Sequence, residues 1–339
     1  MKSKEQRAAW ADLRTTRSNP PGAAAASPVR RSTYAAALQQ AEELFEAGSS
    51  AGAASAPLSL FYGLSQAGRA IAAAAPVLTG PDWQLSGHGI KAQQLDGKLS
   101  DIRVFAVPKE PASSFVRLST LLGSPVWTGT DAIGFAQVWN AVPGLAGHPI
   151  ALAREARPPL LATPNSPLDG HPLVGAWISG IPALLADSGR TASDFRTFMS
   201  GYPTADGYTY VNDGDGYPDY QMDEGGTTVG VQMYWEAGER HPVPEQVRVA
   251  RINQVVKPYS YGEFYLYPQL IAGQPPLHPL MAWWTVLYTL SMLARYHPAA
   301  WTAAIDVDKS AAATALEHVL TEAAATIPAL VLQVLREVA

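Results

Sequence analysis

The stretch "LSLFYGLSQAGRAIAAAAP", residues 58–76, admits two structures that imply different proteins. A buried strand followed by a sharp Gly-x-Ser-x-Ala turn would make Ser65 the exposed nucleophile of a serine hydrolase. A single continuous helix would leave Ser65 as one polar residue on its side. The helix is favoured, because apolar residues recur at i, i+4, i+7 and i+11: Leu60, Leu64, Ala67 and Ile71.

The surrounding chain also favours the helix. A nucleophile turn needs a sheet already built around it, and no strand candidate precedes residue 58. Ala67 stands where the hydrolase motif has its second glycine. Ser55 can cap the helix, Pro57 fits its first turn and Pro76 ends it. We therefore predict one helix over 58–76 and keep the hydrolase as the weaker alternative.

Composition excludes several classes of protein. The chain has 339 residues, of which 47% are apolar and 16% charged, so it can bury a sizeable core. The net charge is −5 and no Lys/Arg-rich run occurs, which disfavours a broad nucleic-acid-binding surface. Cysteine is absent, so disulfides, thiolate metal sites and a Cys nucleophile are excluded. We predict no metal centre and no cofactor.

Targeting signals are also missing from the sequence. The N-terminal stretch has no apolar segment after its basic start, unlike a secretory signal. The most apolar run, residues 280–294, is 15 residues long, whereas a membrane span needs about 20. We expect a soluble cytoplasmic protein that does not enter a membrane.

The order of elements predicts a mainly α fold with a β-containing middle, an α+β class. Residues 18–29 suggest a linker after a short helix around Trp10, and residues 33–47 suggest a helix. We expect an N-terminal helical part (1–100), a loop-rich β-containing region (101–270) and a C-terminal helical part (271–339). The C-terminal part is expected to complete one core with residues 30–100.

Local sequence patterns predict individual strands and helices. Short β-prone runs predict strands at "IRVFAV", "YTYV", "TTVGVQMYW" and "EQVRVARINQVV" (102–107, 208–211, 227–235 and 245–256). Helices are predicted at 280–297, near 309–325 and at 327–338, with Asp308 or Ser310 as a cap for the second. Small residues at 63, 67, 68, 70 and 72 would let another helix approach, with Trp283 and Trp284 filling the space.

Two helices carry polar stripes within otherwise apolar sequence. One stripe holds Tyr62, Ser65, Gln66 and Arg69, and the other holds Trp284, Tyr288, Ser291 and Arg295. A buried unpaired Arg is costly. Both arginines either converge on an anion such as a phosphate or carboxylate, or satisfy helix ends and carboxylates such as Glu317, Asp306 and Asp308.

Two histidines stand at positions of interest. His88 lies between two glycines and can approach a ligand closely, or it can serve as a turn residue bonded to backbone. His297 precedes Pro298 at a helix end, where its charge can favour the helix dipole. We count both among the candidate ligand-binding residues.

The acidic segment "NDGDGYPDYQMDE", residues 212–224, partly matches a calcium loop. Asp213, Asp215, Asp219 and Glu224 fit the ligand spacing, but Pro218 replaces the turn glycine. The flanks suggest strands, which favours an acidic hairpin tip over a calcium site.

Three strings resemble the YaaC-like family of bacterial proteins: "PLSLFYGLSQAGRAI", "GHGI" (87–90) and "HPLMAWWTVLYTLSMLARYHPAAW" (278–301). The likeness spans nearly the whole chain and implies no reaction. "FYGLSQAGRAI" followed by "GHGI" also looks distantly like HEPN-type helical domains, whose ribonucleases use an Arg followed, after four to six intervening residues, by a His. None of the histidines here has an Arg at that spacing, which puts nuclease activity in doubt.

Two functions remain open. One is binding of a phosphate-bearing small molecule or RNA in a pocket between the two polar stripes, with a role in stress or defence that the HEPN-like resemblance implies. The other is a non-catalytic protein that acts through a protein partner or through oligomerisation. In either case we expect a homo-oligomer, taken as a dimer.

Overall fold

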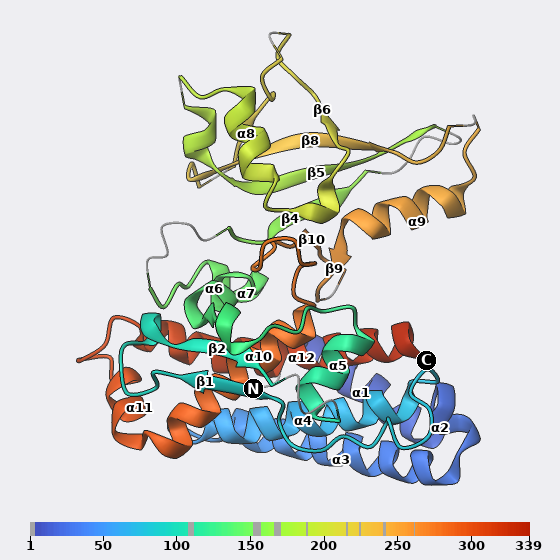
Figure 1. The fold of residues 1–339 in the computed structure, drawn as a ribbon, viewed down its shortest axis with the longest axis vertical. Coiled ribbons are helices and arrows are strands. Elements are labelled where there is room, and N and C mark those ends of the chain that lie inside the picture. Colours follow the sequence, from blue (N-terminus) through green and yellow to red (C-terminus); the bar gives the residue numbers. More distant parts are fainter. Residues whose placement is uncertain are drawn as a thin grey trace. The chain divides into compact units, whose positions relative to one another are not determined.

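The computed structural model describes residues 4–107, 112–151, 157–165, 171–187, 189–214, 216–223, 225–239, 242–260 and 262–339. The chain forms two compact units (Figure 1). Unit 1 combines Met1–Ala156 with Leu277–Ala339, and unit 2 is Arg157–Pro276. Each unit is described by itself below.

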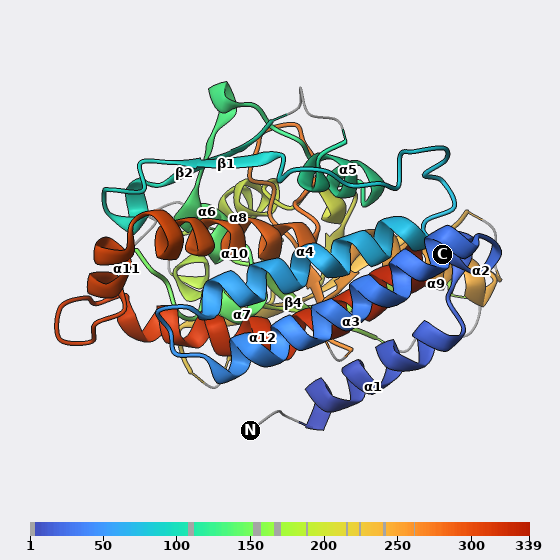
Figure 2. The ribbon, with the colours of Figure 1, turned by 90° about the horizontal axis from the view of Figure 1, so that it is seen from below.

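Unit 1 is a helical bundle with a small sheet. Its helices are α1 (Lys4–Ser18), α2 (Gly22–Ala26), α3 (Pro28–Ser50), α4 (Ala56–Ala74), α5 (Ser114–Leu121), α6 (Phe135–Asn140), α7 (Pro143–Ala146), α10 (Pro279–Tyr296), α11 (Pro298–Ala304) and α12 (Ala313–Val338). Helix α4 packs against α3, α10 and α12 (Figure 2). The α+β class is confirmed, as is the single core formed by the N- and C-terminal helices.

Helix α4 is continuous from Ala56 to Ala74, so the strand–turn–helix reading of Ser65 is wrong. Pro57 lies in the first turn as expected, but the Ser55 side chain makes no capping bond. The helix approaches its neighbours through glycines. A Cβ at Gly63 would lie 2.7 Å from the Phe45 ring, and one at Gly68 would lie 2.8 Å from the Trp284 ring. The predicted small-residue contact is confirmed.

The small sheet of unit 1 consists of β1 (Ile90–Gln93), β2 (Arg103–Ala106) and β3 (Ile133–Gly134). Both pairings are antiparallel, with β2 in the middle. Val104 and Ala106 of β2 are buried and alternate with less buried residues, as expected for a strand with one face on the core. This strand confirms part of the predicted run at 102–107.

Unit 2 is an antiparallel sheet with helices on one face. Its strands are β4 (Leu160–Pro164), β5 (Leu173–Pro182), β6 (Thr209–Tyr210), β7 (Gln221–Met222), β8 (Thr228–Glu236), β9 (Lys257–Pro258) and β10 (Phe264–Leu266). They run in the order β6-β8-β5-β4-β10-β9, with β7 also paired to β8. Phe195 and Met199 of α8 (Ala192–Met199) pack on the buried face. The strands predicted at 208–211 and 227–235 are present.

Residues 245–256 are mainly helical, so the strand predicted there is wrong. They form α9 (Glu245–Val255) after Pro244. Arg248, Ile252 and Val255 stand at i, i+4 and i+7, which places them on one helical face. Arg248 and Val255 are buried, and Ile252 packs beside the core of unit 2. Because the buried position 248 is occupied by an arginine, the apolar residues of this segment do not by themselves show the helical period.

The C-terminal prediction of two helices is also wrong, because α12 runs unbroken through Pro328. Its buried residues continue at helical spacing on both sides of the proline, which lets packing hold the helix together. Neither predicted cap holds its first turn, since the N-cap residue is Ala312. Residues 18–29 are likewise not a plain linker, because they contain α2.

Among the described residues, α12 is the helix long and apolar enough to cross a membrane. Most of its apolar stretch is buried inside unit 1, as in a core helix. The length and apolar composition of α12 are therefore weak evidence for a membrane span.

The acidic segment forms a tight turn in its described part. The Asn212 side-chain oxygen accepts from the N–H of Gly214 at 3.0 Å, and Asp213 Oδ1 accepts from the N–H of Tyr217 at 3.2 Å. Asn212 also bridges to Pro218 in antiparallel fashion. Two of the proposed calcium ligands, Asp215 and Glu224, lie outside the described residues.

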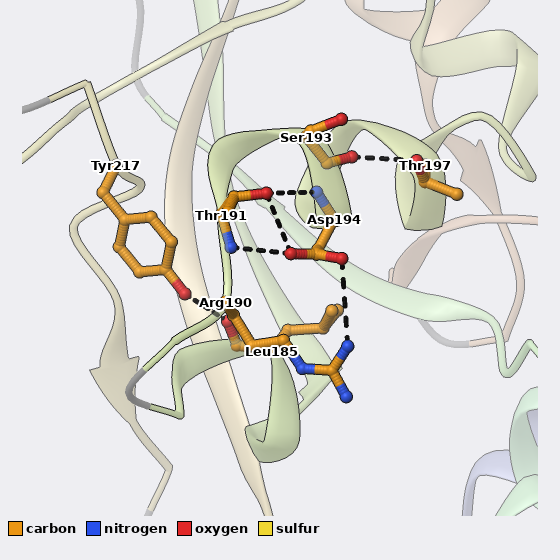
Figure 3. Close-up of polar contacts among 7 residues, drawn as sticks. All are labelled: Leu185, Arg190, Thr191, Ser193, Asp194, Thr197 and Tyr217. Carbon is orange, nitrogen blue, oxygen red and sulfur yellow. Dashed lines mark hydrogen bonds and ion pairs between the residues drawn. The ribbon is translucent and has the colours of Figure 1, made fainter.

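Helix α8 begins with a reciprocal cap (Figure 3). Asp194 Oδ2 accepts from the backbone N–H of Thr191 at 2.7 Å, and Thr191 Oγ1 accepts from the N–H of Asp194 at 3.3 Å. The hydrogen bond from the Thr191 backbone, followed by that from its hydroxyl and the charge of Arg190, lowers the pKa of Asp194. The ionised carboxylate is therefore the form that caps α8.

We expect Asp194→Ala to reduce hydrogen-exchange protection of the α8 amides at neutral pH. Because the folded pKa is depressed, this stabilisation is present above the ordinary value of 3.8 and disappears as pH falls through the lower folded value. The difference in protection between wild type and variant should shrink across that window. Ser193→Ala, in the same turn, is the control. A difference that does not depend on pH would contradict the role of the charge.

Candidate functional site

Helices α4 and α10 bring two predicted residues into contact. Arg295, near the end of α10, donates from Nη1 to Tyr62 Oη, near the start of α4, over 3.2 Å. The guanidinium of Arg295 also lies 5.0 Å from the ring centre of Tyr296. Arg295 is exposed and makes no ion pair with any residue that the structure describes. The Arg295 guanidinium is permanently charged and faces solvent, and after its bond to Tyr62 it still has N–H groups that can donate to a ligand.

The imidazole of His88 packs beside this contact between two aromatic rings. Its ring centre lies 5.5 Å from that of Phe61 and 5.8 Å from that of Tyr288. Phe61 directly precedes Tyr62 along the chain, and their ring centres lie 5.7 Å apart, so the histidine and the arginine border one region. Burial, with a smaller effect of Tyr296, raises the pKa of Tyr288 to about 12. The phenol is therefore neutral at physiological pH.

The backbone around His88 is held in one conformation. Gly87 and Gly89 have φ of +60° and +71°, the left-handed region that favours glycine. The His88 carbonyl accepts from the N–H of Phe115 at 3.0 Å, at the start of α5, and the Gly87 carbonyl accepts from Ser114 Oγ at 3.0 Å. A Cβ at Gly89 would collide with Ser113. The Gly-His-Gly stretch is thus a fixed turn that caps α5.

Arginines anchor the loop that leads to His88. Arg69 donates from Nη1 to the Leu85 carbonyl at 3.2 Å, and Arg117 pairs with Asp82 at 3.0 Å. No contact among the described residues joins Arg69 to Arg295. Arg69 therefore supports the loop, whereas Arg295 faces solvent.

A third arginine in this loop's support was missed by sequence reasoning. Arg30 donates to the Leu78 carbonyl and to three carbonyls at the end of α4. Its guanidinium also lies over the Trp83 ring at 5.4 Å. Arg30 carries no sequence signal, because its partners are backbone carbonyls more than 40 residues away.

The remaining predicted residues lie on the same helices as the cluster, or directly after α10. Ser65 and Gln66 are half-buried on the stripe between Tyr62 and Arg69. Ser291 is buried and donates to the Tyr288 carbonyl at 2.7 Å. His297 ends α10, where its N–H donates to the Leu293 carbonyl at 2.9 Å. The structure therefore brings together Tyr62, His88, Tyr288 and Arg295, which we call the Arg295 cluster.

Buried donors lie close to this cluster. Trp284 is fully buried and packs edge-on against Phe61, yet its Nε1 has no acceptor among the described residues. Arg69 Nε is also buried and has no acceptor among the described residues. Buried donors without partners are costly, and they favour acceptor-rich groups nearby.

The chemistry offered by the Arg295 cluster suits an anion. It combines a guanidinium, phenol donors and an imidazole, and no carboxylate belongs to it. Among the described residues, no group of three or more His, Asp or Glu side chains is arranged to hold a metal ion. The arrangement can bind and orient an anionic ligand.

Comparison with known proteins identifies the family. A family model described as YaaC-like Protein matches residues 3–335. No curated protein and no solved structure matches the chain, so the distant likeness to HEPN-type domains has no support. Because the match covers nearly the whole sequence, the chain belongs to the YaaC-like family.

Proposed function

We propose that unit 1 binds a phosphate-bearing ligand, a nucleotide or an RNA end, at the Arg295 cluster. The observation that carries the proposal is the exposed Arg295 guanidinium. It is oriented by Tyr62 at 3.2 Å and has no carboxylate partner among the described residues. A guanidinium with free N–H groups matches the geometry of phosphate oxygens better than an ammonium does.

Exposed aromatic rings support a nucleotide over a simple phosphate. The side chain of Tyr62 is 37% exposed and that of Tyr296 is 60% exposed, and both flank Arg295. Bases stack on exposed tyrosine rings, and such stacking contributes about 1–3 kcal/mol per base. Arg295 would then bind the phosphate while a neighbouring ring receives the base.

His88 and Tyr288 would border the ligand on its other side. The fixed Gly-His-Gly turn keeps the imidazole in place before a ligand arrives, which lowers the ordering cost of binding. The other candidate residues would shape the polar stripes beside the ligand and hold the neighbouring loops. They are Ser65, Gln66, Arg69, Ser291 and His297. The proposal covers binding and assigns no reaction.

Native mass spectrometry of protein purified without added ligand tests the proposal. We expect wild-type protein to carry a phosphorus-containing compound that is released on denaturation, and Tyr62→Phe to carry less of it. Arg336→Met removes an exposed charge from α12 and should behave as wild type. Co-purification of a protein in place of a phosphorus-containing compound would favour the alternative, a non-catalytic interaction protein. The proposal also includes a homodimer, a cytoplasmic location and a role in stress or defence. The same spectra give the mass of the assembly and therefore test the homodimer.

A further inference from the structure

One face of the unit 2 sheet carries a pair of aromatic rings, whereas the described helices α8 and α9 contribute residues to the core on the other face. Successive residues of β5 point to opposite faces. Val174, Ala176 and Ile178 are buried in the core with α8, so Gly175 and Trp177 belong to the other face. On β8, Gly230, Gln232 and Tyr234 share that face, as the paired register requires.

The two rings lie down across the neighbouring strand. Trp177 is paired with Gln232, yet its indole reaches Gly230, two residues further along β8. A Cβ at Gly230 would lie 2.7 Å from Trp177 Nε1, with other ring atoms closer still. Gly175 is paired with Tyr234, and a Cβ there would lie 2.8 Å from the Tyr234 ring. Each ring therefore rests on a glycine and covers the sheet surface.

The centre of this face, around the two rings, is uncharged, and the charged residues among its described strand positions lie at the edges. Glu236 is paired with Leu173 at the end of β8, and Lys257 of the edge strand β9 is paired with Tyr265, which is itself paired with Leu161. The central strand residues offer hydroxyls, an amide and aliphatic groups, and Leu161 is 37% exposed. The members around the two rings are Leu161, Thr163, Leu173, Ser179, Thr209 and Gln232. Single-stranded nucleic acid would require several cations along its backbone, and among the described strand residues of this face Lys257, at the edge strand, is the one cation.

The geometry points to this face as a binding platform for a neutral oligosaccharide. The negative face of an aromatic ring attracts the C–H-lined face of a pyranose, and hydroxyl and amide groups beside the rings can bond the sugar hydroxyls. Trp177 and Tyr234 would each receive one sugar ring, with Gln232 between them. The glycines beneath the rings set the height and tilt of the platform.

The test is calorimetric titration of the full chain with maltohexaose and with cellohexaose. We expect millimolar or tighter binding of at least one of them, and at least tenfold weaker binding in Trp177→Ala. Gly230→Ala should weaken binding similarly, because the added methyl displaces the ring. Gly225→Ala is the matched control, since a Cβ there meets nothing closer than 3.9 Å.

Several results would overturn the platform. The absence of binding by wild type to both sugars would do so, and so would unchanged binding in a folded Trp177→Ala protein. Binding of oligouridylate that depends on Trp177, without sugar binding, would assign the face to RNA. A wild-type dimer that Trp177→Ala converts to monomers, again without sugar binding, would assign it to self-association. Circular dichroism and thermal melting establish that each variant is folded.

Discussion

Replacement of Arg30 by Met is expected to lower the free energy of unfolding of unit 1 by about 3 kcal/mol. The guanidinium donates to the carbonyls of Ala72, Ala73, Ala75 and Leu78, with N···O distances between 2.7 and 3.0 Å. These carbonyls lie at the end of α4, where a helix leaves acceptors without partners. The variant keeps much of the side-chain volume and removes all four donations.

Arg31→Met is the matched control for this prediction. Arg31 is exposed and donates only to the Ala25 carbonyl among the described residues, so its loss should change stability by less than about 0.5 kcal/mol. Urea unfolding followed by circular dichroism measures both variants. Arg30→Lys should fall between wild type and Arg30→Met, because one ammonium cannot reach four carbonyls. Equal stability of the two Met variants would show that α4 needs no such cap.

Replacement of Gly68 by Val is expected to cost about 3 kcal/mol or more, through overpacking between α4, α5 and α10. A Cβ at Gly68 would already lie 2.7 Å from Leu118 and 2.8 Å from Trp284. Both neighbours are fully buried and cannot move aside easily. Ser59→Val, which places the same side chain on a less crowded part of α4, controls for the helix propensity of valine.

A second substitution shows whether the effect of Gly68→Val comes from α10. Trp284→Phe removes ring atoms that contact Gly68, so the double variant should recover part of the lost stability. We expect the double-variant cycle to show a coupling of about 1 kcal/mol or more. Strict additivity of the two substitutions would contradict the close approach of α4 and α10.

The helical core was predictable because its residues obey one strong periodicity. The faces at 60/64/67/71 and 280–294 are apolar, and proline marks the start of each helix. The small residues of α4 further predicted a close neighbour. Predictions of secondary structure were wrong where one residue departed from the expected pattern. Arg248 obscured the helix α9, and Pro328 suggested a break in α12 that packing overrides.

The candidate site was predictable only in part. Tyr62, His88, Tyr288 and Arg295 were selected from polar stripes and a Gly-flanked histidine, and the structure brings these four together. The same stripes suggested that Arg69 meets Arg295. Two helical turns, roughly 10 Å along the axis, separate Arg69 from Tyr62, and the partner of Arg69 is a loop carbonyl. Contacts with backbone carbonyls leave no trace in side-chain pattern, which also explains why Arg30 was missed.

The platform of unit 2 depends on a different kind of information. Tyr234 and Gly230 lie in the strand predicted at 227–235, where a glycine is expected to weaken the strand, whereas the sequence pattern predicts no strand around Gly175 and Trp177. Only the register, which pairs Gly175 with Tyr234 and places Gly230 under Trp177, reveals why glycines stand there.

The central claim is that Arg295 binds the phosphate of the ligand, and a calorimetric comparison of AMP with adenosine tests it most directly. Wild type should bind AMP at least tenfold more tightly than adenosine, and Arg295→Met should lose this difference while its melting temperature stays close to that of wild type. Arg336→Met should keep the difference. An Arg295→Met protein that still distinguishes AMP from adenosine, or wild type that binds neither, would contradict the account.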